Sequence, residues 1–271
     1  MNDYIAILIV GSLLLVSLAA ATGSNNQVSV DITQEAKGNC VTGNVLIDQE
    51  TYAIANVVGC NNHVSQDIDA YADGNQLTGK NNPANLIQIC SIIGNVSGNN
   101  NNLEQNVDAN LMNNSIVEST LSQRAAEKAD IVGSYNNVHQ STSVNSYKNK
   151  LTSSSLYQVS SLVVSCPGNY NWVDQRISES TNRSSLVISK SWQVAMGSAN
   201  LLGNKNTINQ QSAISSNDAK NTVAQEYQEI LETANILGNS NTVFHNLTLT
   251  GAANHVVVGS LIQKTNVTTN L

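Results

Sequence analysis

Two stretches of the sequence decide the fold: residues 199–210 read ANLLGNKNTINQ, and residues 234–245 read ANILGNSNTVFH. They lie 35 positions apart and differ only by small substitutions. A period of this size is typical of solenoid proteins, in which each repeat is one structural unit that stacks on the next. The repeat therefore predicts a stacked array rather than a globular domain with one central core.

The shared pattern consists of Gly, Asn three positions later, an aliphatic residue two positions after that, and Gln after another two. Its near-complete copies begin at Gly59, Gly98, Gly133, Gly168, Gly203 and Gly238, and a degraded copy begins at Gly23. From Gly98 onward each copy follows the previous one by 35 residues. A register kept this strictly indicates a structural requirement that every copy shares.

A second Gln lies about midway between the first ones, and the combined series has a regular step. The series is Gln49, Gln66, Gln88, Gln105, Gln123, Gln140, Gln158, Gln175, Gln193, Gln210, Gln228, His245 in place of Gln, and Gln263. The numbering rises alternately by 17 and by 18, except for one rise of 22 that fits a four-residue insertion near the sequence GKNNPAN. These steps predict a coil of about 17–18 residues, with two alternating kinds of coil in each 35-residue repeat.

Within each coil, apolar and polar residues alternate. The residue two before Gln is aliphatic in most copies and the residue directly before Gln is mostly polar, as in Val138, His139 and Gln140. This period of two is the mark of a β-strand with one buried face. We therefore predict an all-β fold, a single β-solenoid of stacked two-strand β-arch coils, in which Asn, the aliphatic residue and Gln face inward. The sequence leaves open whether the coils wind as two sheets or three.

The repeated amides have a physical reason. Strands stacked about 4.8 Å apart place each inward Gln over the next, so its amide N–H can donate to the neighbouring amide oxygen along the whole column. A single buried amide without a partner costs roughly 1–3 kcal/mol, whereas a continuous ladder satisfies every member except at its ends. Each copy is thus expected to be the hydrogen-bonding partner of the coils before and after it. We interpret His245 as a structural substitute in this column, because it can still donate or accept.

Composition narrows the possible partners. The 271 residues include 11% charged and 4% aromatic residues, with a net charge of -7 and a pI near 4.9. An acidic chain with few charges lacks the basic patch that nucleic acid requires.

Residues 1–21 hold an apolar run ending in Ala19, Ala20 and Ala21, which predicts a cleaved secretory signal peptide, although no Lys or Arg precedes the run. An uncleaved membrane anchor is the alternative. Residues 22–271 are then an exported solenoid that is secreted or on the cell surface, with membrane contact only through an uncleaved signal segment.

Gln and Asn columns in a short β-arch coil resemble the curlin repeats of bacterial amyloid fibres. The Asn-rich, acidic and exported version is more similar to the major sheath proteins of filamentous methanogenic archaea. The resemblance covers about residues 23–271 and rests on the pattern G-x-x-N-x-[VIL]-x-Q. Curlin coils are longer, with a fixed Ser and more Gly, and four cysteines are not expected there. The resemblance implies self-assembly into an extracellular fibre or sheath, with the protein itself as the partner.

No catalytic or cofactor signature accompanies the repeat. The sequence contains no G-x-S-x-G, H-E-x-x-H, C-x-x-C or phosphate-binding Gly loop, so we predict neither an enzyme nor a bound cofactor or metal. The acidic segment with Asp67, Asp69 and Asp73 lacks the later ligands of a helix-loop-helix calcium site, and a solvated face explains it better than a weak calcium site. The competing hypothesis is a secreted solenoid adhesin, or a β-helix that binds or cleaves polysaccharide.

Cysteines and sequons complete the candidate sites. In an exported chain the four cysteines are expected to be oxidised. Cys40 and Cys60 are separated in sequence by nearly one predicted coil length, and they are predicted to bond. Cys90 and Cys166 would lie four coils or roughly 19 Å apart and could bond only between molecules. Candidate glycosylation sites are Asn95, Asn113, Asn182, Asn246 and Asn266.

Overall fold

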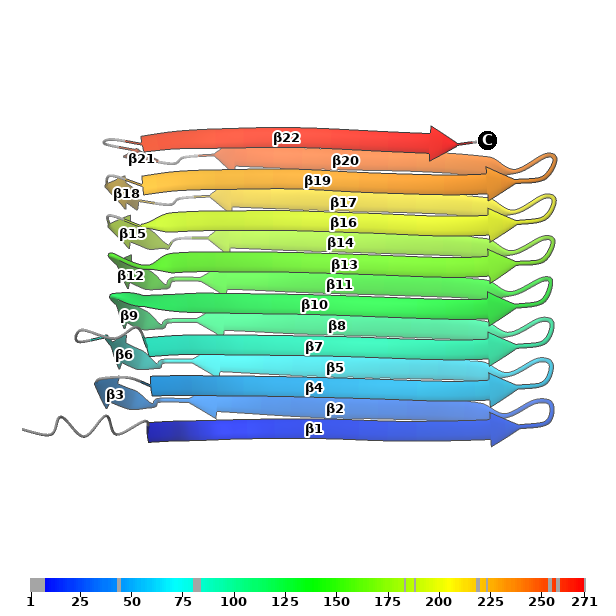
Figure 1. The fold of residues 1–271 in the computed structure, drawn as a ribbon, viewed down its shortest axis with the longest axis horizontal. Helices are drawn as coiled ribbons and strands as arrows, with labels where there is room; N and C mark the ends of the chain where they lie inside the picture. The colour runs from blue at the N-terminus through cyan, green and yellow to red at the C-terminus, as the bar shows by residue number, and fades with distance from the viewer. Residues whose placement is uncertain are drawn as a thin grey trace, which may run out of the picture.

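The computed structural model describes residues 8–42, 45–79, 84–182, 184–187, 189–217, 220–222, 224–252, 255–256 and 259–270. These residues form a β-solenoid in which each strand, except those at the two ends, pairs in parallel with strands of the coils before and after it (Figure 1). The described residues contain no helix. The predicted all-β solenoid class is confirmed.

Three parallel sheets run along the solenoid. Sheet A contains β1 (Leu8–Thr22), β4 (Val45–Val58), β7 (Ala84–Ser97), β10 (Ser119–Val132), β13 (Ser155–Pro167), β16 (Lys190–Leu202), β19 (Ala224–Leu237) and β22 (Gly259–Asn270). Sheet B contains β2 (Gln27–Lys37), β5 (His63–Asp73), β8 (Asn102–Met112), β11 (Asn137–Tyr147), β14 (Trp172–Asn182), β17 (Thr207–Asn217) and β20 (Thr242–Ala252). The narrow sheet C contains β3 (Cys40–Thr42), β6 (Gln76–Thr78), β9 (Ser115–Val117), β12 (Lys150–Thr152), β15 (Ser185–Val187), β18 (Lys220–Thr222) and β21 (His255–Val256).

The length of one coil corrects the sequence-based prediction. Gln123 of β10 lies in register with Gln158 of β13, and Gln140 of β11 lies in register with Gln175 of β14. Neighbours in a sheet are therefore 35 positions apart, so one coil is the whole 35-residue repeat. The shorter coil that the glutamine steps predicted is only half a turn. The two halves resemble each other because sheets A and B both line the same narrow interior, and the short sheet C closes one end of it (Figure 1).

Glycine occupies the corner between sheets A and B because that turn admits no side chain. Gly168 has a φ of +141°, and a Cβ placed on it would overlap the carbonyl oxygen of Gly133 in the preceding coil. Two positions later the chain needs a left-handed residue, which is Tyr170 with a φ of 57°. The same pair of conformations recurs at Gly203 and Lys205. The first position of the repeated pattern is thus set by backbone crowding.

The interior is a thin layer of inward side chains between sheets A and B. Along β11, Val138, Gln140, Thr142 and Val144 are buried, while the residues between them are partly exposed. This alternation confirms that the aliphatic residue and Gln face inward. The first two coils are longer than the others, with register offsets of 36 and 39 residues. The predicted four-residue insertion falls between β6 and β7, in a segment whose residues 80–83 are outside the described part.

The N-terminal segment joins the solenoid in this structure. Residues 8–22 form β1, the outermost strand of sheet A, which pairs with β4 and places Leu13 in register with Gln49. Outward residues Val16 and Leu18 of β1 are 61% and 69% exposed. No helix in the described part of the chain is long and apolar enough to cross a membrane. Cleavage of residues 1–21 stays a prediction.

Candidate functional site

The central feature of the interior is a pair of glutamine ladders. In sheet A the ladder contains Gln49, Gln88, Gln123, Gln158, Gln193, Gln228 and Gln263, and in sheet B it contains Gln66, Gln105, Gln140, Gln175 and Gln210. After the first Gln of each ladder, every Nε2 donates to the Gln Oε1 of the preceding coil over 2.7–3.1 Å. The predicted ladder residues therefore face inward and pair, but as two separate columns rather than one alternating column.

Several of these amides also donate to a backbone carbonyl oxygen across the interior. Gln140 Nε2 also faces the carbonyl oxygen of Val163 at 3.4 Å, and Gln158 Nε2 donates to the carbonyl oxygen of Val144 at 3.2 Å. These bonds cross the interior between sheets A and B. Gln140 and Gln158 thus each join three strands, two in their own sheet and one opposite. A buried amide with both protons placed avoids the desolvation cost of an unpaired donor.

Both ladders have the same polarity, so their two ends differ chemically. At the N-terminal end, Gln49 Nε2 donates to the carbonyl oxygen of Tyr71 at 3.2 Å, but its register partner in β1 is Leu13, which carries no amide. At the C-terminal end, Gln263 Nε2 donates to Gln228 Oε1, and within the described residues no further coil follows β22. One end therefore offers an amide donor and the other offers an amide oxygen.

His245 ends the sheet B ladder instead of continuing it. It lies in register with Gln210, but its Nδ1 faces Glu232 Oε2 at 2.8 Å and its Nε2 faces Thr269 Oγ1 at 3.1 Å. Gln210 Oε1 is buried and has no hydrogen-bond partner among the described residues. The imidazole accordingly fills a Gln position in register, and its contacts are with neighbouring inward side chains.

Asparagines build further ladders at the corners. At the glycine corner, the Oδ1 of each Asn accepts the backbone N–H of the Asn one coil earlier over 2.8–3.0 Å; the column is Asn26, Asn62, Asn101, Asn136, Asn171, Asn206 and Asn241. Sequence reasoning missed a second column at the other end of sheet B, formed by Asn39, Asn75, Asn114 and Asn149. The signal was available, because these residues repeat at the offsets of the coils and follow a Gly, Asn or Lys in the left-handed conformation.

Four buried glutamates interrupt the interior of the solenoid: Glu127, Glu179, Glu226 and Glu232. Thr142 Oγ1 donates to Glu127 Oε1 over 2.7 Å, and Ser212 Oγ donates to Glu232 Oε1 over 2.6 Å. Burial raises the pKa of Glu127 well above its usual range and that of Glu179 to about 8. Sequence reasoning missed these residues, although counting in steps of two from the inward Gln175 reaches Glu179.

The predicted disulfides do not match the geometry. All four cysteines are free. Cys40 begins β3 and Cys60 follows β4, so the 14-residue strand β4, roughly 46 Å long, separates them. The predicted bond between Cys40 and Cys60 is therefore wrong. Cys90 and Cys166 lie in β7 and β13, two coils apart rather than four, and both are completely buried.

Burial also changes what the two interior cysteines can do. It raises the pKa of Cys90 and of Cys166 to about 12, which keeps both thiols protonated and unreactive. A bond from either one to a second molecule would require the interior to open. Their small, weakly polar side chains fill positions that other coils give to residues such as Ala125 and Leu201. We therefore interpret Cys90 and Cys166 as core residues.

The remaining predicted sites lie on the outside. Asp67 and Asp69 point outward from β5 as expected, and partial burial raises the pKa of both, with help from neighbouring carboxylates. No cluster of His, Cys, Asp and Glu suited to a metal ion occurs among the described residues. The sequon residues are partly exposed at Asn95 and Asn182 and exposed at Asn113, Asn246 and Asn266. Their glycosylation stays a prediction.

Comparisons with known proteins find no relative. No family model matches the chain, and no significant match exists among the curated proteins or among the solved structures. The function must therefore be argued from the geometry of the solenoid.

Proposed function

We propose that this protein is a structural protein that assembles end to end into an extracellular fibre or cell-surface sheath, and that it is not an enzyme. The observation that supports the proposal is the exposure of inward side chains in the last coil. Inward residues Leu261 and Val267 of β22 are 39% and 43% exposed, whereas Leu156 and Leu162 at the same register positions of β13 are completely buried. The surface that buries such side chains elsewhere in the molecule is another coil.

Backbone chemistry favours the same partner. The outer edges of β20 and β22 carry rows of backbone N–H and C=O groups that pair with no further strand of the described chain. A long, flat edge of this kind is a template for pairing with another strand. A second copy of the solenoid supplies strands with the same twist, spacing and inward pattern, so it can cover both edges at once.

Loss of the predicted signal peptide would expose the N-terminal end of the solenoid for docking. Sheet A has eight strands, while sheets B and C have seven each. Removal of residues 1–21 would delete β1 and make β4 the outermost strand of sheet A, with Gln49 at its surface. On this proposal β2, β3 and β4 of one copy dock on β20, β21 and β22 of the next. Gln49 Nε2 of the arriving copy would then donate to Gln263 Oε1, which continues the ladder with the polarity seen inside the molecule.

The test is to express residues 22–271 and to examine the purified protein by negative-stain electron microscopy and sedimentation velocity. We expect filaments whose length grows with protein concentration. Gln263→Lys should stop growth, because it places an ammonium group in the docking face. Thr268→Lys is the matched control, since it adds the same charge to the outward face of β22 and should leave growth intact.

Two results would contradict the proposal. If the chain of residues 22–271 remains monomeric at high concentration, self-assembly is wrong. If filaments form equally well with Gln263→Lys and without it, the molecules associate through some other surface than the terminal coils. Circular dichroism of both variants separates a loss of docking from a loss of folding.

A further inference from the structure

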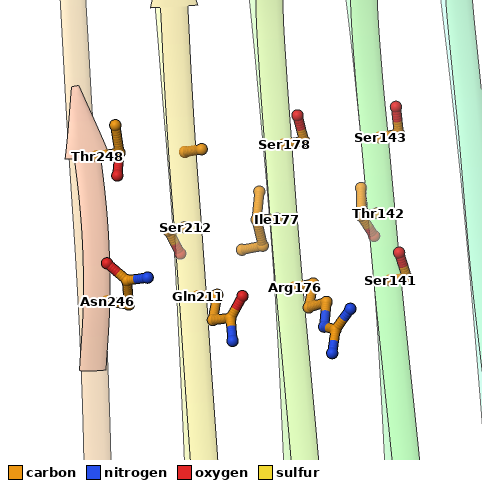
Figure 2. Close-up of a pocket in the computed structure, with 11 residues that line it drawn as sticks. Ser141, Thr142, Ser143, Arg176, Ile177, Ser178, Gln211, Ser212, Asn246 and Thr248 are labelled. Atoms are coloured by element: carbon orange, nitrogen blue, oxygen red, sulfur yellow. The ribbon is translucent and has the colours of Figure 1, made fainter. Parts of the chain in front are cut away.

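The outer face of sheet B carries a shallow trough, lined by both polar and apolar atoms, that self-assembly through the ends leaves uncovered. Its volume is about 300 Å³, and it crosses β11, β14, β17 and β20. Figure 2 shows Arg176, Gln211 and Asn246 in one row and Ser143, Ser178 and Thr248 in the next. The floor is made of small side chains, while the first row offers amide and guanidinium groups.

Arg176 is held in place beside this trough by a buried carboxylate. The Asp174 side chain is only 2% exposed, and its Oδ2 accepts from Arg176 Nη2 over 2.8 Å. Its Oδ1 accepts from Asn209 Nδ2 over 2.9 Å, and its Oδ2 also lies 3.1 Å from His139 Nδ1. Three neighbouring strands thus converge on one carboxylate. The guanidinium uses part of its five donors in this contact, and the Arg176 side chain remains 54% exposed, so other donors can reach a ligand.

An exposed aromatic ring lies on the same strand. Trp172 of β14 is 45% exposed and sits four residues before Arg176, roughly 13 Å along the strand. Some other surface rings are stacked on each other, as Tyr135 on Tyr170 and Tyr157 on Trp192. The register neighbours of Trp172 are Asn137 and Thr207, which carry no ring. Its indole is therefore available to an outside molecule.

The chemistry of this face selects the ligand. The Arg176–Asp174 pair is neutral as a unit and the whole chain carries a net charge of -7, which disfavours nucleic acid and other polyanions. The row of Ser143, Ser178, Ala213 and Thr248 combines three hydroxyl groups with one methyl group, which suits an amphipathic ligand better than a lipid. A linear chain of sugars has hydroxyl groups that both donate and accept, together with apolar ring faces that stack on indole. From Trp172 to Ser178 the face is roughly 20 Å long, enough for several sugar rings.

We propose that the outer face of β14, from Trp172 through Arg176 to the trough at Ser178, binds a neutral linear polysaccharide. Arg176 and Gln211 would hydrogen-bond its hydroxyl groups, and Trp172 would stack on one ring. On a fibre built from stacked coils, this face would repeat once in every molecule. The site does not depend on assembly, since all its residues belong to one chain.

The experiment is isothermal titration calorimetry on the full chain carrying Gln263→Lys, with three neutral probes, cellohexaose, chitohexaose and laminarihexaose, and an alginate hexamer as the acidic probe. We expect at least one neutral hexasaccharide to bind. Ser178→Tyr fills the trough and should weaken that binding at least about tenfold. Arg176→Ala and Trp172→Ala should each weaken it several-fold. Ser161→Tyr makes the same change on the outer face of sheet A and should leave the affinity unchanged.

Three outcomes would overturn this assignment. The first is that none of the three hexasaccharides binds at millimolar concentration. The second is that binding survives Ser178→Tyr and Arg176→Ala, which places the site elsewhere. The third is that only an oligouronate such as an alginate hexamer binds, which makes the ligand an anion. Failure of filament formation in the unmodified chain is a separate result, because calorimetry reads a single molecule.

Discussion

Gln140 and Glu179 lie on adjacent strands of sheet B, and both side chains point into the same interior and are buried. Gln140 Nε2 donates to Gln105, and Gln140 Oε1 accepts from Gln175. The register neighbours of Glu179 are Val144 and Ile214, whose side chains offer no hydrogen bond. Burial raises the pKa of Glu179 to about 8, and neither of its carboxyl oxygens has a hydrogen-bond partner among the described residues.

This difference shows what a stacked interior tolerates. A neutral amide has a donor on one side and an acceptor on the other, so a column of amides satisfies itself and its length does not matter. A carboxylate has only acceptors, and an isolated one in a dry interior keeps a proton instead of its charge. Repetition therefore makes polar residues suitable for this core, whereas burial raises the pKa of the isolated carboxyl groups of Glu127 and Glu179 and so favours their protonated form. The predictions below test that distinction.

The largest effect is expected from a deletion that shifts the two ladders. Deleting Gly203 through Leu237 removes one whole coil and should leave a shorter solenoid of similar stability per residue, because each coil contacts only its neighbours. Deleting Gln193 through Asn209 removes half a coil and moves every following strand into the wrong sheet. We expect that variant to lose cooperative unfolding and soluble yield, as measured by thermal denaturation. Equal tolerance of both deletions would contradict two separate columns.

The second largest effect is expected from a charge placed inside a glutamine ladder. Gln140→Glu should lower the free energy of unfolding at neutral pH by roughly 3–5 kcal/mol, because it strands a carboxylate between Gln105 and Gln175. Ser141→Glu is the matched control, one residue away on the outer face and in register with Arg176. His139 is a poor control, since its ring lies 3.1 Å from Asp174. Urea denaturation measures both variants, and similar losses would mean that the inward face is assigned incorrectly.

Glu179 predicts a pH dependence with a definite sign. Its pKa is about 8 when folded and near the ordinary value of 4.5 when unfolded, so between these values the folded state binds more protons. Stability should fall as pH rises through this window, by up to about 1.4 kcal/mol per pH unit, and should level off above pH 8. Glu179→Gln should reduce the slope in melting temperatures recorded from pH 5 to pH 8. A variant with the unchanged slope would show that Glu179 is not the titrating group.

The smallest effect concerns the end of the sheet B ladder. With Glu232→Gln as background, adding His245→Gln should stabilise the protein by about 1 kcal/mol, because Gln210 Oε1 gains the donor that it lacks. The background substitution is needed because His245 also contacts Glu232 over 2.8 Å. Chemical denaturation of the single and double variants gives the difference. No gain, or a loss, would mean that the ladder has no preference for an amide at this position.

Several features of the structure follow from the repeat alone. The alternation around Gln140 identified the inward face, and the recurrence of Asn and Gln predicted hydrogen-bonded columns. Counting in steps of two from Gln175 also reaches Glu179, so the alternation predicts that this side chain faces inward. The residue type alone would predict an exposed position. Glycine at the corner was also predictable, whereas the overlap with the preceding carbonyl that excludes Ala required the stacked coils.

The sequence by itself determined the strand alternation, the inward amides and the 35-residue period, because these are properties of the order of residues along one chain. Only the tertiary structure decided whether Gln123 stacks on Gln140 or on Gln158, since both choices satisfy the same alternation and both offer an amide partner. That choice set the coil length, added the third sheet and separated Cys40 from Cys60. It also placed Asp174 between His139, Arg176 and Asn209, because contacts across strands depend on register, and register is fixed by how a whole coil closes on the next.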